Sequence, residues 1–235
     1  MLNQANQGYD HSLTMFNPDG RLFQVEYALE AVRRGTLAIG LKSDAGACLI
    51  TLKKYSKLME PNSIKKIYPL DGHIGCSIAG LHADSRILVD YTRVQCQVHR
   101  LTYGEPVRVQ TIVRQIAKIM QNYTQHGGIR PFGCSLMFIG VDPDNKAYLM
   151  TTSPSGIYKA WKGATVGRNS GEAKDRLAAE LTDELSLDEL IRLGVKTLQE
   201  SVEDDIDAKS LQIAHISVED GLFKVMNEEE CQNYL

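Results

Sequence analysis

Two pairs of amphipathic segments interrupt the strand-like runs of this chain, and their order limits the folds available to it. Apolar residues recur at three- and four-residue steps in these segments, which predicts helices. The runs between them are short and apolar, as expected of strands. Because strands and helices come in groups and do not alternate singly, the order favours an α+β fold over a strict βαβ alternation. The helical segments are residues 87–98, 109–123, 171–184 and 187–202, with a short terminal helix expected at 227–235, and the strand-like runs are residues 36–41, 47–52, 73–79, 134–141, 147–152, 156–160, 164–167, 211–218 and 222–226.

A further amphipathic helix precedes the first strand. Apolar residues at helical spacing from Leu22 to Val32 predict a helix over residues 20–34. The Asn-Pro-Asp-Gly turn at residues 17–20 comes before it, and Gly35 is a natural C-terminal stop. The chain therefore places structure ahead of the strand that begins at residue 36.

Composition and charge narrow the possible partners and locations. The formal net charge of −3 gives no electrostatic reason to expect nucleic acid or an anionic membrane as a partner. No apolar run approaches the ~20 residues that a membrane span needs, and the N-terminal residues lack the pattern of a signal peptide. The five cysteines include no C-x-x-C pair, so buried reduced thiols explain them best, and we expect an intracellular, cytoplasmic protein. No linker-like stretch divides the chain, so residues 1–235 are expected to form one domain.

Motifs of catalytic or ligand-binding chemistry are absent from the sequence. The nearest approaches to a G-x-S-x-G nucleophile motif include Ser77 and Ser135, but both serines lie within strand-like runs and are better explained by strand packing. There is no phosphate-binding glycine motif, and the six histidines are scattered without the spacing of a metal site. The acidic run at residues 203–207 is most simply a solvated loop. No cofactor or metal is expected.

Several ordered stretches nevertheless match one known family. The leading segment contains Tyr9-Asp10 and then Phe-Asn-Pro-Asp-Gly-Arg-Leu-Phe-Gln-Val-Glu-Tyr-Ala at residues 16–28, which resembles the N-terminal motif of proteasome α-type subunits, the α class of the proteasomal threonine peptidase family. The resemblance extends over essentially the whole chain, with further matches at residues 58–67, 78–86, 123–125 and 130–133.

This resemblance implies both a fold and a set of partners. The fold would be a four-layer αββα sandwich, the N-terminal-nucleophile hydrolase architecture, with an extra N-terminal helix. The partners would be other α subunits in a seven-membered ring, the proteasome β subunits, and the C-terminal tails of a regulatory ATPase or another activator. The implied role is to form the entry pore and antechamber and to support ATP-dependent or ubiquitin-linked protein degradation by the β subunits.

The same resemblance bears on whether this chain is itself a protease. Residues 35–40 line up with the start of β subunits, which places Thr36 at the position of the catalytic threonine and Lys66 at that of the catalytic lysine. The position of the catalytic acid falls on Leu52, which can neither orient nor polarise a partner. Thr36 also has a peptide bond in place of the free amine that such catalysis uses. The chain is therefore expected to be non-catalytic. The alternatives are an active N-terminal threonine hydrolase processed to Thr36, and a ring-forming scaffold that acts alone.

In similar α subunits the lysine that matches Lys66 lines a pocket between neighbouring subunits. There it pairs with the C-terminal carboxylate of an activator tail, a role that suits an ammonium group at a partly buried site. Gly35 matches a glycine that leaves room for the tail. The resemblance therefore implies activator docking at Lys66 and Gly35.

The resemblance also implies a gate made by the tail at residues 1–17. Tyr9, Asp10, Pro18 and Tyr27 match the residues that hold such tails in the open arrangement. The chain departs from the common pattern at His11, where many members have arginine, so an ion pair there would be lost or become pH-dependent.

A second departure is Ser153, where many members have aspartate and where only a local effect on a turn is expected. The sequence leaves open the α isotype, the choice between seven copies and seven different chains, and an archaeal or eukaryotic source. In a eukaryote the protein would also be nuclear.

Overall fold

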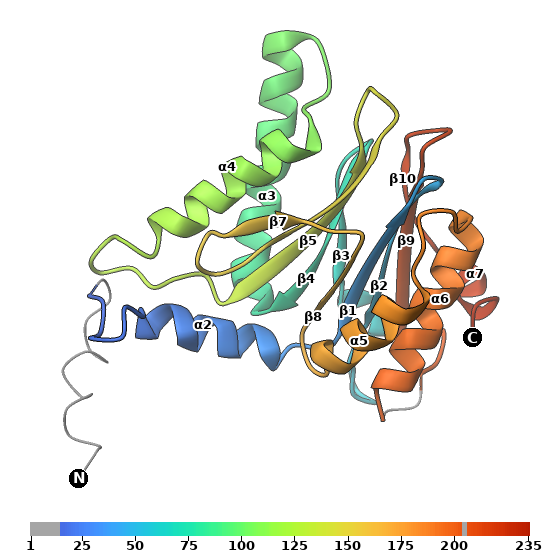
Figure 1. The fold of residues 1–235 in the computed structure, drawn as a ribbon, viewed down its shortest axis with the longest axis horizontal. Helices are drawn as coiled ribbons and strands as arrows, with labels where there is room; N and C mark the ends of the chain where they lie inside the picture. The colour runs from blue at the N-terminus through green and yellow to red at the C-terminus, as the bar shows by residue number, and fades with distance from the viewer. Residues whose placement is uncertain (1–14, 204–205) are drawn as a thin grey trace.

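The computed structural model describes residues 15–203 and 206–235, and two five-stranded antiparallel sheets lie at its centre (Figure 1). The first sheet has the strand order β10-β9-β2-β1-β8. Its middle strand β2 is buried along its whole length, because it lies against a helix layer on one face and the second sheet on the other. The strands of this sheet are β1 (Ala38–Ser43), β2 (Gly46–Leu52), β8 (Gly163–Val166), β9 (Leu211–Ser217) and β10 (Phe223–Val225).

The second sheet has the order β3-β4-β5-β6-β7. Strand β5 is buried at every position and pairs with both β4 and β6. The turn between β5 and β6 includes Asn145 in the left-handed region at a φ of 55°, which suits the Asp-Asn chemistry of that loop. The strands of this sheet are β3 (Ile67–Asp71), β4 (Ile74–Gly80), β5 (Cys134–Val141), β6 (Ala147–Thr152) and β7 (Tyr158–Ala160).

Helix pairs cover the outer face of each sheet. Helices α3 (His82–Tyr103) and α4 (Val109–Asn122) pack on the second sheet, and α5 (Ser170–Glu180) and α6 (Leu187–Ser201) pack on the first. Figure 1 shows the resulting order of layers, and the hydrophobic core divides accordingly into one cluster under each helix pair and one between the sheets. The predicted α+β, four-layer αββα sandwich is confirmed.

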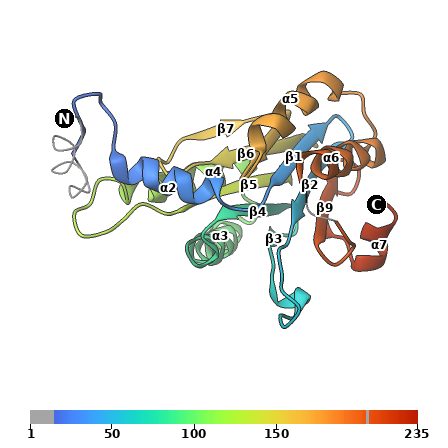
Figure 2. The ribbon, with the colours of Figure 1, turned by 90° about the horizontal axis from the view of Figure 1, so that it is seen from below.

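The leading helix α2 (Phe23–Arg33) lies across the ends of the sandwich, where it contacts β4 and β5. Figure 2 shows it from below, together with the segment at residues 53–66 that joins β2 to β3 and projects from the body. That segment contains the single turn η1 (Pro61–Ser63), and the short helix α7 (Glu228–Gln232) follows β10. The predicted leading and terminal helices are therefore present.

Two features differ from what the sequence pattern alone indicates. Strand β3 is not among the predicted runs, because Pro69 interrupts it; the structure places it at the edge of its sheet, where a missing N–H is tolerated. On α3 the residues Ile87, Tyr91, Val94 and Val98, whose apolar spacing predicts the helix, lie on one face, and that face is exposed. The buried face of α3 carries a different set: Asp84, Ser85, Leu88, Val89, Thr92 and Cys96.

All five cysteines are free and buried, as expected of reduced thiols, and burial raises the thiol pKa of each. Ser77 and Ser135 lie in β4 and β5 as buried strand residues. Within the described ranges no helix combines the length and apolar character needed to cross a membrane.

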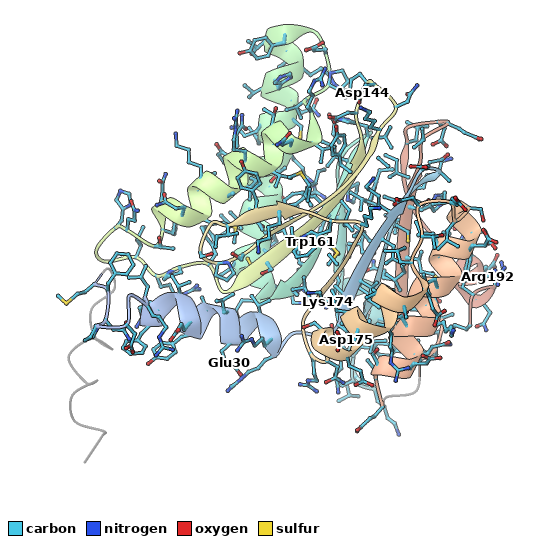
Figure 3. All side chains as sticks on the ribbon, in the orientation of Figure 1. Glu30, Asp144, Trp161, Lys174, Asp175 and Arg192 are labelled. Atoms are coloured by element: carbon cyan, nitrogen blue, oxygen red, sulfur yellow. The ribbon has the colours of Figure 1, made fainter. Side chains whose placement is uncertain are left out.

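Trp161, between β7 and β8, donates a hydrogen bond to Thr151 and has Lys174 of α5 over its ring (Figure 3).

Candidate functional site

Thr36 and Lys66 meet at the end of the sandwich, where the chain leaves α2 and enters β1. The Lys66 Nζ donates a hydrogen bond to the Thr36 carbonyl at 3.0 Å and another to the Thr36 hydroxyl. That hydroxyl in turn donates to the Leu52 carbonyl at 2.7 Å. The backbone N–H of Lys66 donates to the Gln212 side chain at 2.9 Å, which anchors the lysine to β9. Segments far apart in sequence therefore hold the Lys66 amine in a fixed position.

The Lys66 side chain is almost completely buried, with 3% of its surface exposed. Burial lowers its pKa from 10.5 to about 7, because the charged ammonium loses its hydration. In the part of the chain that the structure describes, no carboxylate forms an ion pair with it. Burial and the nearby Lys66 charge also lower the pKa of His82, at the start of α3. Lys66 is thus a buried base without a counter-ion from the described residues.

Leu52 stands where the catalytic acid would be, and it has no acidic group to offer Thr36 and Lys66. Its side chain is apolar and buried, and only its backbone carbonyl reaches the Thr36 hydroxyl. The nitrogen of Thr36 is a peptide nitrogen, since Gly35 and α2 precede it. The arrangement therefore keeps a threonine and a lysine in contact, without the carboxylate and the free amine that activate a threonine nucleophile.

Gly35 is held by backbone contacts on both sides. Its carbonyl accepts a hydrogen bond from the Arg168 N–H at 2.8 Å, and its N–H donates to the Val32 carbonyl at 3.0 Å. A Cβ on Gly35 would lie 2.6 Å from the backbone nitrogen of Gly80. Glycine is therefore required here by the close approach of the chain to the end of β4, whatever else binds at this place.

Two hollows flank the Thr36–Lys66 pair. One, of about 320 Å³, is lined by Thr36 and Leu52 together with Arg34, Arg168 and Glu203. The other, of about 420 Å³, lies between the segment at residues 53–66 and the start of α3. Lys54 borders both hollows. Groups of at least three potential metal ligands are absent from residues 15–203 and 206–235.

Comparison with known proteins decides the family. A family model described as "Proteasome subunit" matches residues 32–216, and a second model, which describes the N-terminal signature of α-type proteasome subunits, matches residues 9–31. The chain belongs to the proteasome subunit family. It is 43% identical over 229 residues to the proteasome α subunit of Methanosarcina acetivorans, covering 97% of this chain and 92% of the relative. It is 42% identical to the protein of the same name from Archaeoglobus fulgidus, with the same coverage. Identity is 46% to that of Methanopyrus kandleri, over 89% of this chain and 85% of the relative.

These relatives place the chain among proteasome α subunits, as the motif at residues 16–28 predicts. The structure brings Thr36, Leu52 and Lys66 together, as the alignment with β subunits implies. Gly35 lies directly before Thr36 but is not among the residues that line either hollow. Docking at Gly35 and Lys66 stays a prediction.

The residues expected to hold the gate are only partly within the described structure. Tyr9, Asp10 and His11 lie outside the described residues. Pro18 is exposed in a tight turn, which the Asn17 side chain closes by accepting the N–H of Arg21 at 2.8 Å. Tyr27 has 51% of its surface exposed and stacks on Phe23 of the same helix, with ring centroids 6.2 Å apart. Both described gate residues thus lie on the surface, Pro18 in the turn before α2 and Tyr27 on α2 itself.

At Ser153 the hydroxyl lies 2.8 Å from that of Ser155, within a turn. The Ser153 N–H donates to the Ile157 carbonyl at 3.0 Å, so the expected local turn is present.

Sequence reasoning did not assign a role to several residues near Lys66. Lys54, Tyr68, His82 and Arg86 line the 420 Å³ hollow but belong to no recognised catalytic motif. Arg86 is part of the stretch at residues 78–86 that matches the family, and this match was the only sequence signal for it.

Proposed function

We propose that the chain is a non-catalytic subunit of the α ring of the proteasome core particle. The proposal rests on the surroundings of Thr36. Its nitrogen is in a peptide bond to the segment that contains α2, and its hydroxyl contacts Leu52 where catalysis would need a carboxylate. In this role the chain forms part of a gated entry pore and antechamber for the proteolytic β subunits. It supports ATP-dependent or ubiquitin-linked degradation without cleaving peptides itself.

Assembly with neighbouring subunits is supported by the exposed apolar face of α3. Ile87, Val94 and Leu101 are 60%, 56% and 87% exposed and lie on one helix. A contiguous apolar surface of this kind is typical of a face that a partner covers. The partners proposed are other α subunits in a seven-membered ring and the β subunits. The location proposed for the chain is the cytoplasm, and also the nucleus if the source is eukaryotic. The three relatives named above are archaeal.

Activator docking is proposed at Lys66. A C-terminal carboxylate would supply the counter-ion that the described residues do not give this buried amine. The tail at residues 1–17, held by Tyr9, Asp10, Pro18 and Tyr27, is proposed to form the gate that such docking opens.

Intact mass spectrometry of the chain purified from assembled core particles tests the non-catalytic role. We expect the unprocessed chain, with residues 1–35 present, and we expect Thr36→Ala to leave peptidase activity unchanged. A mature chain that starts at Thr36 would instead establish the active threonine hydrolase. Purification without any β subunit or peptidase activity would favour a scaffold that acts alone.

A further inference from the structure

The larger hollow beside Lys66 combines an apolar lining with positive charge. It has a volume of about 420 Å³ and lies between the segment at residues 53–66 and the N-terminal end of α3. Met59, Ile64 and Tyr68 supply the apolar part of its lining. The hollow is close to Lys66, because Lys65 lines it and because His82, another lining residue, feels the Lys66 charge.

The charged residues around this hollow have one sign. Lys54, Lys65 and Arg86 line it, together with His82, and the described lining residues include no carboxylate. Lys65 and Arg86 form no ion pair with any described residue. Elsewhere on the surface some cations are paired within the chain, as Arg100 is with Asp71 and Lys196 with Glu180. The smaller hollow differs, because Glu203 lies among its cations.

We propose that this hollow binds an acidic side chain of the segment that precedes an activator's C-terminal carboxylate, with Lys65 and Arg86 as the receiving cations. The inference rests on the proposed docking of a tail at Lys66 and adds a requirement on the sequence of that tail. An arginine fork and a lysine ammonium both match a carboxylate, and the apolar lining suits the aliphatic or aromatic side chains of a peptide. A nucleic acid would satisfy the charges but would leave the contacts with Met59 and Ile64 unused.

Peptide binding to the assembled core particle tests the proposal. The probes are eight-residue peptides with fluorescein at the N-terminus, a free C-terminal carboxylate and a tyrosine near that end. Glutamate is placed at each of the second to fifth positions before the C-terminus in turn, and each peptide is compared with its glutamine counterpart by fluorescence anisotropy. At one of these positions or more we expect glutamate to bind about tenfold tighter than glutamine, which corresponds to ~1.4 kcal/mol.

The variants separate this site from general electrostatics. In Lys65→Ala/Arg86→Ala the preference for glutamate should disappear, whereas Lys57→Ala, an exposed lysine of the same segment that does not line the hollow, should keep it. Lys65 is exposed and Arg86 lies on the exposed part of α3, so the double variant should fold and assemble.

The outcomes distinguish this inference from the proposed function beneath it. Equal binding of glutamate and glutamine peptides, with binding still abolished by amidation of the C-terminus, would overturn the acidic requirement and leave docking at Lys66 intact. Failure of every peptide to bind would overturn both. A fluorescein-labelled DNA 12-mer that binds as tightly as the glutamate peptides, and loses affinity in the same double variant, would make the hollow a general polyanion site and overturn the assignment to a peptide.

Discussion

Replacing Lys66 by methionine should stabilise the chain at neutral pH, although it removes a side chain that donates two hydrogen bonds to Thr36. The side chain is buried, and its ammonium has no counter-ion among the described residues. Methionine has a similar length without the charge. The backbone hydrogen bond to Gln212 does not depend on the side chain and should remain.

The size of the effect follows from the pKa of Lys66, which burial lowers from 10.5 to about 7. At ~1.4 kcal/mol per pH unit, the charged form costs the folded state about 5 kcal/mol relative to the neutral form. Methionine leaves the Thr36 carbonyl without its donor, which costs about 1–3 kcal/mol. The variant should therefore be more stable than the wild type by about 2–4 kcal/mol at pH 7 and below.

The sign of the difference should reverse at high pH. Between the folded pKa of about 7 and the unfolded value of 10.5, the unfolded chain binds more protons than the folded one, so the wild type gains stability as the pH rises. Well above pH 10.5 the wild-type lysine is neutral in both states, and only the lost hydrogen bonding of the variant remains. The two stability curves should cross between about pH 8 and 10.

Urea denaturation of the purified chain from pH 6.5 to 10.5 measures this difference directly. Lys65→Met is the matched control, because Lys65 is exposed and adjacent in sequence, and it should change stability by less than about 0.5 kcal/mol at every pH. The tyrosines and cysteines titrate in both proteins, so their effect cancels in the difference between the two unfolding free energies. A difference that stays constant from pH 7 to 10 would refute the reasoning that Lys66 is charged at a buried site without a counter-ion.

Three further substitutions test other contacts. Gly35→Ala places a Cβ 2.6 Å from the Gly80 nitrogen and should cost about 1–3 kcal/mol; an unchanged melting temperature would contradict the close approach. Asp84→Ala removes the partner of Arg130 and should cost about 2–4 kcal/mol at pH 7 by urea denaturation. The Arg130 hydrogen bond lowers the pKa of Asp84, so this stabilisation is present above the unfolded pKa of ~3.9 and should fade as the pH falls through the lower folded value. Ser186→Ala breaks the capping box of α6 and should cost about 1 kcal/mol, whereas Ser186→Asp should retain most of it.

Much of the fold could be predicted because its strands are apolar and its turns have distinctive residues. Strands β5 and β6 begin and end at the predicted residues, since the polar loop at 142–146 separates two buried runs. The helix α6 begins at the predicted residue 187, directly after Ser186, which forms a capping box with Glu189. Strand β3 could not be found in this way, because Pro69 and the half-exposed residues of an edge strand obscure its pattern.

Periodicity alone did not indicate which face of α3 the core would cover. Spacing identifies residues that share a face, and Val94 and Val98 do so, but α3 has a second apolar stripe that includes Leu88 and Val89. The buried face, which packs on the sheet, also includes the polar residues Asp84, Ser85 and Thr92. The other stripe, which includes Ile87 and Val94, is exposed on the isolated chain, and it is the face proposed above to contact neighbouring subunits.

The site was less accessible to sequence reasoning than the fold. Thr36 and Lys66 are 30 residues apart, and neither has a local pattern that predicts their contact. Only the family resemblance paired them, and it could not show that the amine would be buried. The cations at Lys65 and Arg86 come together because the segment before β3 folds against the start of α3, a tertiary contact that no spacing rule describes.

The absence of a carboxylate at Leu52 makes the same place suitable for the proposed docking of a tail. A carboxylate there would balance the buried charge of Lys66 within the chain and would leave little reason for it to attract another anion. With leucine, the described residues supply only the carbonyl and hydroxyl of Thr36, which solvate the ammonium without neutralising it. The lack of a carboxylate beside Thr36 and the proposed capture of a terminal carboxylate are thus two consequences of one apolar residue. A bound anion would offset the free-energy cost of keeping Lys66 charged, and this would favour binding.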